Sequence, residues 1–268
     1  EDLAWTSLCQ GVGFGPRAYA GGGLGLARLD AEGSRLQSSY FAQGAGYWHA
    51  VGAFHLEGSR STLKARRYDQ GSGVHSAVGF FALTGNGNRM LNWGVGPAFG
   101  WDRSIGWTFL FGDKNSAQAD WGSANAALNG CRSLLFFSGK NNTFELPGAG
   151  GGGFTREVAD YGVSWIEGEG TRLKSPYFQS EEGVVQEVFT SPWGLLNFQG
   201  ITLSSETALP KPDWTRLPQA EYIEREKVNL GDEIDQAQQL PADERVEKLL
   251  GVAAAFSVEK GQPRAALA

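Results

Sequence analysis

Short apolar segments with glycine turns recur along the first half of the chain. The segment "AVGAFHLEG" at Ala50–Gly58 has the pattern of a half-buried β-strand that ends in a turn. The same pattern returns every 27 residues, without an insertion or a deletion, in five blocks. These blocks begin at Gly23, Ala50, Ala77, Ser104 and Cys131. A constant period of this kind predicts a repeated structural unit.

The blocks also share their chemistry position by position. The third position is glycine in the first four blocks, and the ninth is glycine in the last four. The seventh position is leucine in four blocks and Phe137 in the fifth. Because neighbouring side chains of a strand point to opposite faces, we expect Leu56 and its equivalents in the core and His55 on the other face.

Each block is followed by a turn rich in Gly, Asn and Asp, a second apolar segment and another glycine turn. This order is typical of a β-hairpin. The sequence therefore predicts an all-β protein, an antiparallel meander of 27-residue hairpin repeats that closes into a barrel or a sandwich. Further strands are expected at 160–168, 184–191 and 194–204.

A β-solenoid is the alternative fold. Each unit would then be one coil, and equivalent positions of successive coils would lie above one another. The constant period favours this arrangement. The second halves of the units match each other poorly, however, and a solenoid would stack these halves too. We therefore prefer the meander at this point.

The composition divides the chain into a β-rich repeat domain at 1–204 and a C-terminal extension at 205–268. Glycine nearly disappears in the extension, which carries 8 basic and 12 acidic residues. The segment 242–258 follows Pro241 and has apolar residues at helical spacing, so it predicts a helix. We expect the extension to dock on the domain or on a partner. The glycine run at 147–154 is expected to be a loop.

Charge and cysteine content restrict the function only partly. The net charge of −6 argues against a nucleic-acid partner. No apolar run reaches the roughly 18 residues of a membrane-spanning helix, so membrane association is not required. The chain begins at Glu1, which suggests a processed secreted, periplasmic or organellar protein. Two cysteines, Cys9 and Cys131, do not define a redox compartment.

The sequence offers few candidates for chemistry. None of the three histidines lies in a recognisable catalytic motif. No nucleophile elbow and no Cys/His cluster is present, so neither a cofactor nor a metal is expected. Aromatic side chains recur through the repeats and are the candidates for stacking on a ligand. The residues proposed for ligand binding are Trp48, Tyr68, Trp93 and Trp107.

These observations favour a non-enzymatic structural or interaction subunit of a larger assembly. The β-domain would be its scaffold, and the extension would bind other protein subunits. A β-barrel module that binds a carbohydrate or a small apolar ligand is the alternative. An outer-membrane-type barrel and an enzyme on a β scaffold are less favoured, because no catalytic constellation selects a reaction.

Overall fold

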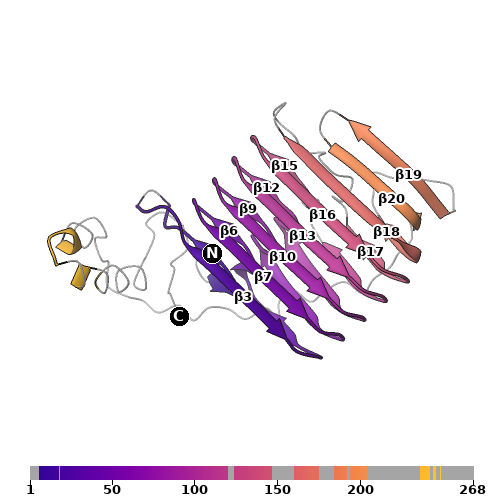
Figure 1. Ribbon diagram of the computed structural model, residues 1–268, viewed down its shortest axis with the longest axis horizontal. Coiled ribbons are helices and arrows are strands. Elements are labelled where there is room, and N and C mark those ends of the chain that lie inside the picture. The colour runs from indigo at the N-terminus through magenta and orange to yellow at the C-terminus, as the bar shows by residue number, and fades with distance from the viewer. Residues whose placement is uncertain are drawn as a thin grey trace.

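A computed structural model shows that the chain forms a parallel β-solenoid (Figure 1). Its long strands lie side by side in one row from β3 to β20 (Figure 1). The structure describes residues 6–17, 19–119, 124–146, 160–174, 184–191, 194–203, 236–241, 244, 245 and 248. For 184–191 it describes the backbone only.

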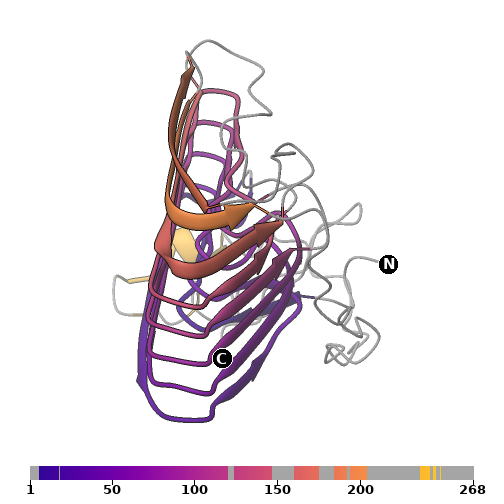
Figure 2. The same ribbon diagram turned by 90° about the vertical axis from the view of Figure 1, so that its right-hand side faces the viewer.

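The longest side of the solenoid is a parallel sheet built from the repeat blocks. Val78 pairs with Val51 on one side and with Ile105 on the other, so the register moves by one repeat per strand. Figure 2 shows the coils nested in the same outline. The strands of this side are β3 (Leu24–Asp30), β7 (Val51–Glu57), β10 (Val78–Thr84), β13 (Ile105–Phe111), β16 (Arg132–Ser138), β18 (Tyr161–Lys174) and β20 (Gly194–Leu203).

Two further sides complete each coil. The second side consists of β4 (Arg35–Gln37), β8 (Thr62–Arg67), β11 (Arg89–Gly94), β14 (Ser116–Ala119) and β17 (Thr143–Glu145). The third side is a separate sheet of two-residue strands, namely β2 (Gly13–Phe14), β6 (Gly46–Tyr47), β9 (Gly73–Val74), β12 (Gly100–Trp101) and β15 (Ala127–Leu128). At the N-terminal end, β1 (Thr6–Cys9) pairs with β5 (Tyr40–Ala42), which joins β8.

The antiparallel meander, and with it the barrel or sandwich, is wrong, and the solenoid alternative is correct. The two strands of a unit do not pair with each other, because the turn between them carries the chain onto a different side of the coil. Each strand instead pairs in parallel with its equivalent in the next unit. The second halves do stack: one inward column consists of Leu36, Leu63, Met90, Ala117 and Phe144. The side chains of this column differ in size, so the second halves of the units look dissimilar in the sequence.

The core lies inside the coils, as the repeat pattern predicts. Leu56, Leu83 and Leu110 are fully buried at the seventh position of their blocks. His55 lies on the opposite face, where its ring is 3.2 Å from the Thr84 hydroxyl. The expected strands of the less regular region are confirmed in β18, β19 (Val184–Ser191) and β20, although β18 continues to Lys174. β19 pairs antiparallel with β20.

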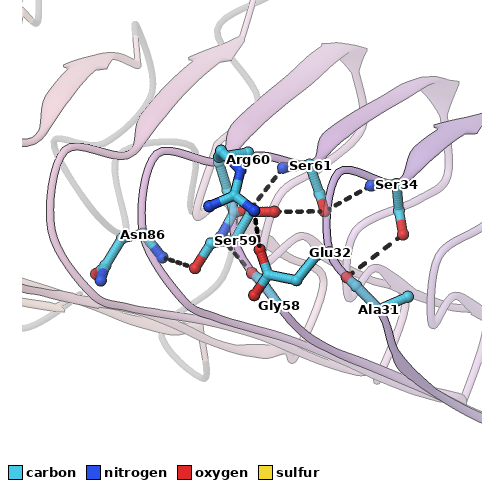
Figure 3. A network of polar contacts seen from close by, with 9 residues as sticks. Ala31, Glu32, Ser34, Gly58, Ser59, Arg60, Ser61 and Asn86 are labelled. Carbon is cyan, nitrogen blue, oxygen red and sulfur yellow. Dashed lines mark hydrogen bonds and ion pairs between the residues drawn. The ribbon is translucent and has the colours of Figure 1, made fainter.

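A ladder of polar side chains joins the coils at the corner after the long strands. The amide of Asn88 donates to Oδ1 of Asn115 at 2.8 Å, and the amide of Asn115 donates to Oδ1 of Asn142 at 2.7 Å. Toward the N-terminus, the Ser34 amide donates to the Ser61 hydroxyl at 3.0 Å (Figure 3). Each side chain satisfies a buried backbone amide of the preceding coil, so this corner is held in register.

A second ladder lies at the corner before the long strands. The Ser104 amide donates to Sγ of Cys131 at 3.1 Å, and the Cys131 amide donates to Oδ1 of Asp160 at 2.8 Å. Both cysteines are free thiols, and burial raises the pKa of Cys131 to about 11. The Cys131 side chain therefore acts as a structural acceptor within the stack.

Little of the C-terminal extension is described, so its boundary and its docking role remain predictions. In the segment expected to be helical, Glu244, Arg245 and Lys248 are in helix. The Arg245 amide donates to the carbonyl of Pro241 at 2.8 Å. The rest of that segment and the glycine run at 147–154 lie outside the described residues. No helix in the described part of the chain is long and apolar enough to cross a membrane.

One carboxyl group is enclosed in the solenoid interior. Asp69 is fully buried, and its Oδ1 accepts a hydrogen bond from Nδ2 of Asn92. Oδ2 of Asp69 and Oδ1 of Asn92 are both buried without a hydrogen-bond partner. Burial raises the pKa of Asp69 well above its ordinary value, although the bond from Asn92 opposes this shift. The folded protein therefore favours the protonated carboxyl.

We expect the Asp69→Asn variant to be more stable than the wild type at neutral and alkaline pH. A raised folded-state pKa contributes stability that is complete below the ordinary value of 3.8 and is lost as the pH rises through the folded-state pKa. Asparagine does not titrate, so its advantage should shrink as the pH falls toward that value. Urea unfolding from pH 4 to pH 9 measures this difference. Asp30→Asn, at an exposed aspartate, is the control and should show no such trend.

Candidate functional site

The corner between the third side and the long sheet has an unusual backbone. Trp48 and His49 have φ values of 54° and 53°, and His75 and Ser76 both have 59°. The equivalent residues of the next coil, Asp102 and Arg103, are also left-handed. Positive φ is uncommon for residues other than glycine, and such residues are concentrated at functional sites. This repeated corner is therefore a candidate functional site.

Backbone hydrogen bonds hold the corner residues one above another. The His75 amide donates to the carbonyl of Trp101 at 2.9 Å, and the Asp102 amide donates to that of Leu128 at 3.0 Å. The second residue of the corner is linked to the next coil in the same way, since the Ser76 amide donates to the carbonyl of Asp102 at 2.8 Å. The side chains of successive coils are thus brought next to each other along the stack.

Four of these side chains form a continuous line, which we name the corner row. It contains Trp48, His75, Asp102 and Asn129, one residue from each of four coils. The rings of Trp48 and His75 are 5.9 Å apart. Nδ1 of His75 lies 2.7 Å from Oδ2 of Asp102, and Nδ2 of Asn129 donates to Oδ1 of Asp102 at 2.5 Å. Each polar member is therefore oriented by its neighbours.

The corner row lines an open cavity of about 480 Å³, the corner cavity. The rest of its lining comes from the second residues of the corners, His49, Ser76 and Arg103. This volume is in the usual range of small-molecule sites, which is about 300–1,000 Å³. The cavity combines one indole with amide, imidazole, carboxylate and guanidinium groups, so it can offer both stacking and hydrogen bonds.

The protonation of His75 is determined by its burial and by two charged neighbours. Burial lowers its pKa below the ordinary 6.5, and the positive charge of Arg17 lowers it further. The Asp102 carboxylate opposes both effects. His75 is therefore mainly neutral at pH 7. The bond to Asp102 places the proton on Nδ1 and leaves Nε2 as an acceptor.

Arg17 completes the positive side of the site. Its guanidinium lies 5.4 Å from the centre of the Trp48 ring, and its side chain hydrogen-bonds to Tyr47. Within the described part of the chain, no carboxylate lies within ion-pair distance of Arg17 or Arg103.

A histidine oriented by an aspartate is also the arrangement of a general base. Catalysis by a nucleophile requires a hydroxyl or thiol within hydrogen-bond reach of that histidine. Among the described residues, no such group hydrogen-bonds to His75. No group of three or more possible metal ligands is found in the described ranges either. The described residues thus provide an imidazole oriented by a carboxylate, without a protein nucleophile hydrogen-bonded to it.

The four aromatic residues proposed from the sequence lie in separate places. Only Trp48 lines the corner cavity. Tyr68 stacks on Phe41 at 5.0 Å in an apolar cluster. Trp93 is partly buried at the end of β11, and Arg66 lies 5.1 Å from its ring centre. Trp107 lies on the outside of β13, with 37% of its surface exposed.

Sequence reasoning missed Asp102, Arg103 and Asn129, although the signal was present. The residues just before the aligned blocks are Trp-His, His-Ser, Asp-Arg and Asn-Gly, spaced 27 residues apart. A parallel stack brings such equivalent positions into contact, whereas a meander separates them. The wrong pairing therefore concealed the site.

A second surface is the outer sheet face, formed by the outward side chains of β3 to β18. Aromatic rings contact each other across its strands: Phe80 and Phe109 at 5.4 Å, and Phe136 and Trp165 at 5.8 Å. In its first strand, β3, the exposed fractions of Leu24 and Leu26 are 70% and 64%. A hollow of about 210 Å³ lies near Ala53. The face combines these apolar side chains with polar ones, among them the Arg28–Glu57 ion pair at 2.6 Å and the contact between His55 and Thr84.

Comparisons with known proteins found no matching family model, curated protein or solved structure.

Proposed function

We propose that this protein is a non-enzymatic scaffold that binds a carbohydrate in the corner cavity. The observation that carries this proposal is the corner row, which places a partly exposed indole in line with three oriented polar side chains. The row follows the axis of the stack, so it suits an elongated ligand that presents similar groups at intervals.

The chemistry of a sugar matches this lining. A sugar ring has an apolar C–H face, which packs on an aromatic ring, and a rim of hydroxyls that both donate and accept hydrogen bonds. Trp48 supplies the aromatic surface. Asp102 and Asn129 supply acceptors, Asn129 and Arg103 supply donors, and Nε2 of neutral His75 accepts. Since the row is held by internal hydrogen bonds, little ordering is required when a ligand binds.

Trp48→Ala should weaken glycan binding about tenfold or more, because it removes the stacking surface of the cavity. The measurement is binding of the full chain to a glycan array, followed by titration calorimetry of the best ligands. Trp107→Ala is the matched control, since it removes an exposed indole from the outer sheet face. It should change affinity less than about twofold. The proposal fails if no glycan binds, or if Trp48→Ala binds as well as the wild type.

A structural or interaction subunit is the second candidate, and the outer sheet face favours it. Large contiguous apolar surfaces on soluble proteins often mark contacts with other proteins. Leu24, Leu26, Val51, Trp107 and Phe111 are all exposed on this face. Other protein subunits that bind here, or through the C-terminal extension, would make the solenoid a connecting element. The two functions are compatible, because the face and the corner cavity lie on different parts of the coil.

A further inference from the structure

We propose that the saccharide bound in the corner cavity is acidic and that Arg103, which lines the cavity, and Arg17, at the Trp48 ring, attract its carboxylate groups. This inference rests on the proposed carbohydrate-binding function and specifies its ligand class. It follows from the charges around the cavity and from the partners that these charges already have.

The positive groups are available to a ligand. Arg103 lines the cavity and is exposed, and Arg17 is exposed, with its guanidinium over the Trp48 ring and a hydrogen bond to Tyr47. No described carboxylate neutralises either of them by an ion pair. A guanidinium group offers a planar set of N–H donors that matches both oxygens of a carboxylate. A sugar that packs near Trp48 would bring a ring carboxylate within reach of Arg17.

The negative groups near the cavity are already bound by donors of the protein. Asp102 accepts from His75 through one oxygen and from Asn129 through the other. Asp160, at the next coil, accepts from the amides of Asn129, Gly130 and Cys131 at 3.1, 2.6 and 2.8 Å. These bonds hold both carboxylates in place, whereas the guanidinium groups of Arg17 and Arg103 have no carboxylate partner among the described residues.

The corner row also determines how binding depends on pH. The charged and titratable groups that interact with His75 are Arg17, Asp102 and Tyr47, and His49 and Arg103 line the same cavity. Neutral His75 adds no charge to the cavity at pH 7. As the pH falls below its lowered pKa, His75 gains a proton and the cavity gains one positive charge. The affinity for an acidic saccharide should therefore increase as the pH falls through the lowered pKa of His75, while that for its methyl ester should change less.

The experiment compares each acidic saccharide with its methyl ester, which has the same ring and no charge. Oligosaccharides of glucuronic, mannuronic and galacturonic acid are titrated into the full chain. We expect the best acid to bind about tenfold or more tightly than its ester, as for one charge-assisted hydrogen bond. Arg17→Gln with Arg103→Gln should reduce this acid-to-ester ratio to near one. Arg60→Gln removes the same charge at another corner, where Arg60 pairs with Glu32 (Figure 3), and should keep the ratio.

The outcomes separate the two proposals. An acid preference that is lost in the double arginine variant and kept in Arg60→Gln supports the inference. Equal binding of acids and esters, with loss of both in Trp48→Ala, overturns the acidic ligand and leaves carbohydrate binding intact. An acid preference that persists in the double variant overturns the role of these arginines. Absence of binding to acids, esters and the glycan array overturns both proposals.

Discussion

Gly79→Ala is expected to lower the free energy of unfolding by about 3 kcal/mol, near the upper end of ordinary overpacking effects. A Cβ atom at this position would lie 2.1 Å from the carbonyl oxygen of Ser72 and 2.7 Å from the carbonyl carbon of Gly71. These are backbone atoms of the third side in the same coil, so they cannot move aside without displacing β9. The same approach recurs at Gly52, where the Ala45 oxygen would be 1.9 Å away.

Gly33→Ala is the matched control for this substitution. Gly33 has a φ of +62°, but no atom lies within 4 Å of an added Cβ. Only the cost of a left-handed alanine remains, which is about 1 kcal/mol. Urea unfolding followed by circular dichroism measures both variants. If both variants lose the same free energy of unfolding, the close approach of the Ser72 backbone does not exclude a side chain at Gly79.

Asn115→Ala should lower the free energy of unfolding by about 2–3 kcal/mol, because it leaves buried backbone groups without partners. Asn115 is 1% exposed. Its Oδ1 accepts from the Asn88 amide at 2.8 Å, and its Nδ2 donates to the Gly85 carbonyl at 3.0 Å. The substitution removes both bonds, while the enclosed corner gives water little access to the amide and the carbonyl.

Asn86→Ala tests whether burial is the reason. Asn86 belongs to the equivalent turn of the preceding coil and accepts from the Asp113 amide at 2.7 Å, but it is exposed. Water can replace its hydrogen bond, so we expect a loss below about 1 kcal/mol. If Asn86→Ala and Asn115→Ala lower the free energy of unfolding equally, burial of the asparagine ladder does not account for its contribution to stability.

The repeat and its core were readable from the residues alone. A gapless period placed Leu56, Leu83 and Leu110 at equivalent positions, and the structure buries all three. The positions of β18, β19 and β20 were also largely predicted, because strand-forming residues and turns mark them. These features depend on the local alternation of side chains, which strand geometry translates directly into two faces.

The pairing of the strands was predicted wrongly because the turns are ambiguous. Gly85-Asn86-Gly87-Asn88 has the composition of a hairpin turn. In the solenoid the same residues form a corner, and Asn88 points inward to the neighbouring coil. A buried asparagine at a fixed period was the available sign of a stack, since a hairpin turn would leave that side chain in water.

The candidate site was also predicted only in part from the sequence. Trp48 was selected from the sequence as an aromatic residue, and the structure places it in the corner cavity. Its polar neighbours His75, Asp102 and Asn129 are each one repeat apart and share no local motif. They come together only because parallel stacking superimposes equivalent positions of successive coils.

By itself, the sequence determined the 27-residue period, the all-β class and the residues that face the core. These properties follow from side-chain alternation and turn chemistry within one unit. The tertiary structure alone decided that the units stack in parallel, and hence which side chains meet at the corner. Pairing between distant strands depends on hydrogen bonds and close approaches between units, such as the asparagine ladder and the contact at Gly79. A single unit does not contain these contacts.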